Sequence, residues 1–77
     1  MKVGEARKLA RELDAALRSD DPRLADVNLE FWGGSTFFIR GAIIEWHEEW
    51  LIVLTEHFGY FLQHRDEVVK AEYRTEG

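Results

Sequence analysis

The spacing of apolar residues changes once along this chain, at Pro22, and that change restricts the folds that the chain can adopt. Before Pro22, apolar residues recur every three or four positions, as on one face of an amphipathic helix. They are Val3, Ala6, Leu9, Ala10, Leu13, Ala16 and Leu17. This spacing predicts a helix over residues 2–19, and a proline at position 22 cannot continue it.

After Pro22 the period becomes two, which is typical of strands with one buried face. Val27, Leu29 and Phe31 alternate with polar neighbours and predict the first strand. Turn residues and runs rich in β-branched and aromatic side chains then predict four further strands. These lie at residues 37–46, 50–58, 60–63 and 69–74.

A glycine interrupts the longest of these strands at position 41, and such a glycine indicates a bulge or a sharp bend. Five short antiparallel strands with one sharp bend favour a small, strongly curled barrel. The predicted fold class is therefore mainly β with an N-terminal α-helix, a bent five-stranded antiparallel barrel of the SH3-like type. We expect a single domain over residues 1–77, with the barrel at residues 24–74.

The stretch EWHEEW at residues 45–50 concentrates negative charge between the apolar stretches GAII and LIVL. A hairpin tip between the second and third strands explains this arrangement, because carboxylates at a tip stay in water. We expect Trp46 and Trp50 to fold inward on either side of the tip.

The length and composition of the chain suggest that it needs support from partner subunits. A chain of 77 residues builds only a small core, and small folds often add disulfides, metals or subunits. There is no cysteine, so disulfides and thiolate metal sites are excluded. The charged N-terminus does not resemble a signal peptide, and no apolar run approaches the roughly 20 residues of a membrane span. These features predict a cytoplasmic homo-oligomer without a membrane partner.

Charge is unevenly distributed along the chain. The net charge is −5, yet residues 1–19 hold five basic against three acidic side chains. On the predicted helix, Arg7, Arg11 and Arg18 form a narrow stripe opposite the apolar face. This stripe is either a solvated face with partners one turn away or a surface for phosphates.

The glycines and apolar positions of the predicted strands resemble the Sm-like family, of the LSm and Hfq type. Gly41, Ile43, Trp46 and the run 52–54 match the spacing of the first Sm motif, and 63–68 occupies the place of the second. The resemblance implies RNA binding. It also implies rings of about five to seven subunits, closed by pairing the fourth strand of one subunit with the fifth strand of the next. The residues that would form this interface are Tyr60, Phe61, Leu62, Val68 and Val69.

The residues that would form the family's uridine pocket differ in this chain. The matching positions hold His47, Glu49, Leu51 and His64, and Arg65 replaces the second motif's glycine. The usual uridine site is therefore lost, although His47, His64 and Arg65 can form another site. The candidate RNA-binding residues are Arg7, Lys8, Arg11, Arg18, His47, His64 and Arg65.

No motif for catalysis, a metal or a cofactor occurs in the sequence. The three histidines lack HxH or HExxH spacing, and there is no P-loop, dinucleotide fingerprint or nucleophile elbow. The ten aromatic residues are more numerous than one small core can hide. Most are expected in the core or a subunit interface, and the alternative is a platform for stacking bases.

The sequence thus predicts a non-enzymatic, ring-forming Sm-like binding protein associated with single-stranded RNA. The alternative is a protein-interaction module without RNA binding, in which an acidic face around Glu45, Glu48 and Glu49 meets a basic protein partner.

Overall fold

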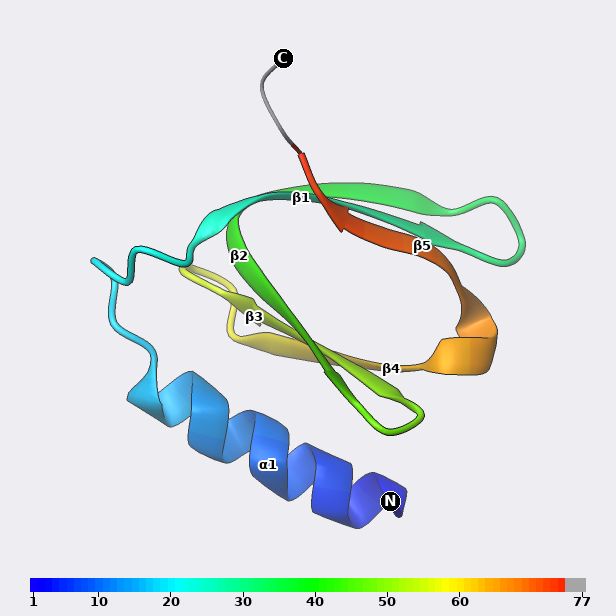
Figure 1. Cartoon of the computed structure of the whole chain (residues 1–77), viewed down its shortest axis with the longest axis horizontal. Helices are drawn as coiled ribbons and strands as arrows, with labels where there is room; N and C mark the ends of the chain where they lie inside the picture. The colour runs from blue at the N-terminus through cyan, green and yellow to red at the C-terminus, as the bar shows by residue number, and fades with distance from the viewer. Residues whose placement is uncertain (75–77) are drawn as a thin grey trace.

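The computed structural model describes residues 1–74 and shows one helix followed by a five-stranded antiparallel sheet (Figure 1). The elements are α1 (Val3–Ala16), β1 (Ala25–Phe31), β2 (Thr36–His47), β3 (Trp50–Thr55), β4 (Tyr60–His64), the 3₁₀ turn η1 (Arg65–Glu67) and β5 (Val68–Tyr73). The strand order is β4-β3-β2-β1-β5, with every neighbouring pair antiparallel. The predicted fold class is confirmed, and the barrel is open because β4 and β5 are the two ends of the sheet.

β2 is the bent strand that turns the sheet into a barrel (Figure 1). Its first half pairs with β1 as far as Ala42, and its second half pairs with β3 from Ala42 to His47. Gly41 lies at this corner with a φ of +73°, in the left-handed region that glycine occupies without strain. The bend predicted at this glycine is confirmed.

Replacing Gly41 by alanine is expected to destabilise the fold by about 1–3 kcal/mol, because a side chain at positive φ is strained. The added Cβ would also lie 2.9 Å from Oε2 of Glu56. Gly59→Ala is the matched control, since Gly59 has a φ of +79° but no atom within 4 Å of such a Cβ. Urea unfolding of both variants measures the difference. A Gly41 variant less affected than the Gly59 variant would contradict this account of the corner.

Two predicted boundaries are wrong. The helix ends at Ala16 and not at residue 19, because Leu17 turns to an extended backbone and packs into the core beneath the helix. β3 ends at Thr55 and not at residue 58. The Thr55 hydroxyl donates to the Gly59 carbonyl at 2.7 Å and accepts from the Phe58 N–H at 2.8 Å. These bonds close a tight turn, so the strand pairing expected as far as residue 58 does not continue.

Apolar side chains form two clusters on opposite faces of β3. The cluster inside the barrel contains Val27, Leu29, Ala42, Leu51 and Val53. The second cluster lies under α1, which covers the β3–β4 half of the sheet (Figure 1), and contains Ala10, Ile43, Ile52 and Leu54. Because both faces of β3 are covered, consecutive residues of this strand are apolar and do not alternate with polar ones.

Candidate functional site

The acidic tip between β2 and β3 contacts the start of α1. The α-amino group of Met1 forms ion pairs with the carboxylates of Glu48 and, at 3.0 Å, Glu49. The Trp50 indole N–H donates to the Met1 carbonyl at 2.9 Å, so Trp50 lies between the chain start and the sheet. Trp46 is 50% exposed, and the expectation that it folds inward is wrong. The tip therefore holds the helix against the barrel.

These ion pairs make stability depend on pH. The Met1 amino group donates hydrogen bonds to the carboxylates of Glu48 and Glu49, which raises its pKa from 8.0 to about 10. The same amino group lowers the pKa of Glu49. Because the amine has a higher pKa in the fold, its contribution is complete below about pH 8 and is lost as the pH rises towards about 10.

We expect urea unfolding to show a loss of stability between about pH 8 and pH 10. The control is the Glu48→Gln/Glu49→Gln double variant, which keeps the shape of both side chains and removes both charges. It should lose less stability over the same interval. An equal loss in both proteins would show that the Met1 ion pairs contribute nothing.

Three of the predicted RNA-binding residues come together beside this tip. His47, Trp50 and His64 occupy one register row across β2, β3 and β4, and the His64 ring packs edge-on to Trp50 at 5.1 Å. The Arg65 N–H donates to the Glu49 carbonyl at 2.7 Å, which places η1 next to the tip.

Carboxylates surround these three residues. His47 lies 2.9 Å from Glu45, and Nε of Arg65 lies 3.8 Å from Asp66. Nδ1 of His64 accepts a bond from the Asp66 N–H at 3.1 Å. The local negative charge disfavours a phosphate at this place.

The other four predicted RNA-binding residues do not form one stripe. Arg7, Lys8 and Arg11 are exposed on α1. No ion pair among residues 1–74 includes these three side chains. Arg18 lies beyond the helix end and 3.5 Å from Asp20, so the expected stripe that included it is wrong. Among the predicted RNA-binding residues, the cations free of ion pairs within residues 1–74 therefore all lie on α1.

All five predicted interface residues lie on β4 and β5, the two edge strands of the sheet. Tyr60 and Leu62 pack against the cluster under α1, and Val68 packs against the cluster inside the barrel. Phe61 and Val69 are each 42% exposed. Of the five, only Phe61 and Val69 belong to the strongly exposed hydrophobic side chains.

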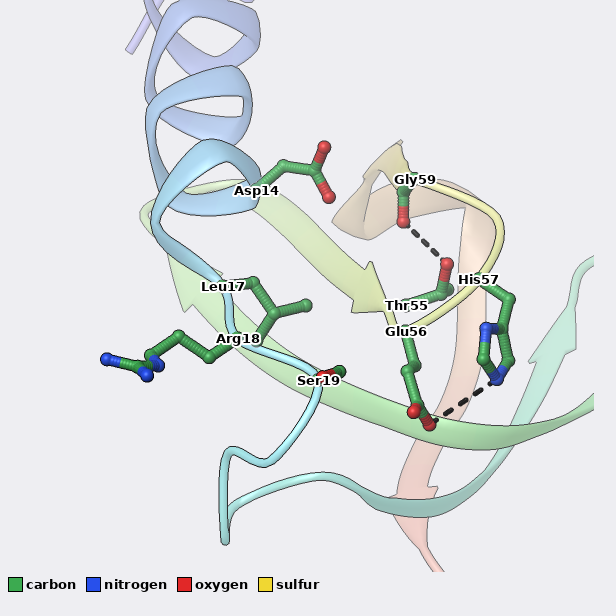
Figure 2. Close-up of a pocket in the computed structure, with 8 residues that line it drawn as sticks. All are labelled: Asp14, Leu17, Arg18, Ser19, Thr55, Glu56, His57 and Gly59. Atoms are coloured by element: carbon green, nitrogen blue, oxygen red, sulfur yellow. Dashed lines mark hydrogen bonds and ion pairs between the residues drawn. The ribbon is translucent and has the colours of Figure 1, made fainter.

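A polar pocket of about 210 Å³ lies where the end of α1 meets the β3–β4 turn (Figure 2). His57 lies 3.6 Å from Glu56, while the side chain of Arg18 extends away from both (Figure 2). The Thr55 hydroxyl is bonded to the backbone of its own turn, so it is not placed as a nucleophile for His57. The sequence did not single out this cluster, because its residues come from distant positions.

A second, larger hollow of about 510 Å³ opens into the barrel between the β1–β2 hairpin and β4. Its lining is mainly apolar, and we name it the Phe groove after Phe31, Phe37, Phe38, Phe58 and Phe61. The sequence shows the excess of aromatic residues, but it does not indicate that these five rings line the same groove.

The described residues contain no cluster of metal-ligating side chains and no helix that could span a membrane. Within residues 1–74, no three His, Asp or Glu side chains are grouped so as to hold a metal ion. No helix in that part combines the length and the apolar character needed to cross a bilayer.

Any function assigned to this chain rests on its own residues and geometry. A scan against protein-family models and searches of curated proteins and of solved structures find no match to it.

Proposed function

We propose that this chain is a non-enzymatic, Sm-like binding protein that assembles into a ring and associates with RNA in the cytoplasm. The observation that carries the proposal is the open sheet, in which β4 and β5 form opposite edges of one antiparallel structure. Edge strands present unpaired N–H and C=O groups that recruit another chain.

Ring closure gives each of these edges a partner. If β4 of one subunit pairs with β5 of the next, every edge is satisfied by the same interface. The resemblance to the Sm-like family implies that about five to seven copies close the circle. Phe61 and Val69 lie half-exposed on these two edges and would be covered by the pairing. A short chain without cysteines gains from this additional burial.

RNA association is supported by the exposed face of α1. Arg7, Lys8 and Arg11 have their charges free of ion pairs within residues 1–74. A ring would repeat this face in every subunit, and repeated weak contacts combine into a much tighter attachment to one strand. The acidic tip is less suited to a basic protein partner, because Glu48 and Glu49 are engaged by Met1.

Binding of oligo-U and oligo-A, measured by fluorescence anisotropy at about 50 mM salt, tests the association with RNA. The Arg7→Glu/Arg11→Glu variant should bind at least tenfold more weakly, since each phosphate contact needs a cation. Affinity should also fall steeply as salt is added.

The matched control is Arg18→Glu/Arg65→Glu, which changes the charge equally at residues that lie beside carboxylates. It should weaken binding less than the helix variant does. The RNA proposal is wrong if assembled protein binds neither oligonucleotide at low salt. It is also wrong if both variants weaken binding equally.

A further inference from the structure

The Phe groove exposes an unusual amount of aromatic surface for so small a protein. Phe37 is 53% exposed, Phe38 is 43% exposed and Phe58 is 75% exposed. Val53 and Leu29, which belong to the buried cluster inside the barrel, also line the groove. The groove therefore leads from the surface to the inner core, and apolar surface of this kind marks a place where something binds.

The size of the groove suits a small molecule. Its volume of about 510 Å³ lies within the range of about 300–1,000 Å³ that is usual for ligand pockets. The turn that carries Phe58 is held by the bond from the Phe58 N–H to the Thr55 hydroxyl. One wall of the groove is thus anchored to the end of β3.

The charge of the lining indicates the sign of the ligand. The chain has 15 acidic residues and a net charge of −5, yet no Asp or Glu lines the groove. Its polar lining residues are Arg40, His57 and Gln63. Arg40 is exposed and takes part in no ion pair among residues 1–74. A carboxylate suits a free guanidinium, which can donate two parallel hydrogen bonds to it.

We propose that the Phe groove binds a small amphipathic carboxylate, with its aliphatic tail among the phenylalanine rings and its head on Arg40. The site does not rest on ring formation or on RNA binding.

Calorimetric titration with hexanoate, octanoate and decanoate, each below its micelle concentration, tests the proposal. Each methylene that becomes buried should tighten binding by up to about fourfold. Decanoate should bind more tightly than decanol, and decyltrimethylammonium should bind most weakly. No saturable binding of decanoate, or equal binding of the cation, would overturn the proposal.

Variants test which residues bind the carboxylate head of the ligand and which bind its aliphatic tail. Arg40→Gln should weaken the binding of decanoate by about tenfold and leave the binding of decanol unchanged. Arg23→Gln is the matched control, because Arg23 is paired with Asp21 and does not line the groove. Phe58→Ser changes a ring that is 75% exposed, so the fold should persist while every ligand binds more weakly. Equal weakening of decanoate by the two arginine variants would refute the role of Arg40.

A repeat of the titration on Val69→Lys protein distinguishes a ligand site from a subunit contact. In this variant the β5 edge is blocked. Binding to both forms supports an intrinsic site. Binding only to the blocked form would show that a second copy covers the groove, and the ligand site in the assembled protein would be refuted.

Discussion

Alanine at Leu51 or at Ile52 is expected to lower the free energy of unfolding by about 2–5 kcal/mol in each case. Both side chains are fully buried, although they are neighbours on one strand. Leu51 belongs to the cluster inside the barrel, and Ile52 belongs to the cluster under α1. Each truncation leaves a cavity that the surrounding side chains fill only in part.

The expected losses are large relative to the stability of such a chain. At about 0.05–0.15 kcal/mol per residue, a domain of this length has a total of about 4–12 kcal/mol. Thermal and urea unfolding followed by circular dichroism measure both variants. Val69→Ala is the control, because that side chain is 42% exposed and should cost much less. A large loss at only one of the two buried positions would mean that only one face of β3 is covered.

Lysine at Val69 is expected to convert the assembled protein to monomers. Val69 lies on β5, an edge strand, where a charged side chain opposes pairing with another chain. The wild-type chain should have the solution mass of about five to seven copies, as the Sm-like resemblance implies, by light scattering coupled to size exclusion. The variant should have the mass of one copy and an unchanged circular dichroism spectrum.

Val3→Lys is the matched control for this experiment. Val3 is 45% exposed, close to the 42% of Val69, but it lies on α1 and not on an edge strand. This variant should keep the assembled mass. A monomeric wild-type chain would refute the ring, and equal dissociation of both lysine variants would show that the β5 edge is not the contact.

The order of the elements was predictable because each element has its own local signal. The change of period at Pro22 separates α1 from the strands, and the glycine in β2 indicates the corner. The ends of α1 and β3 were less predictable. Leu17 continues the helical spacing, yet it leaves the helix to fill the cluster under α1. Thr55 continues an apolar run, yet its hydroxyl closes a turn.

The candidate sites were less predictable than the fold. Arg18 appears on the same helical stripe as Arg7 and Arg11, but the early end of α1 places it on another segment. The sequence indicated that the tip of β2 and β3 is acidic, and it could not indicate that Met1 occupies those carboxylates. That contact joins residues almost fifty positions apart, and no local pattern encodes it.

The sequence by itself determined the elements, their order and the corner at Gly41. Periodicity, turn chemistry and composition act over a few residues, so they can be read along the chain. Tertiary structure alone decided which charges remain free and which aromatic rings gather around the Phe groove. Those outcomes depend on which distant segments the bend of β2 brings together, and on the contacts that those segments then make.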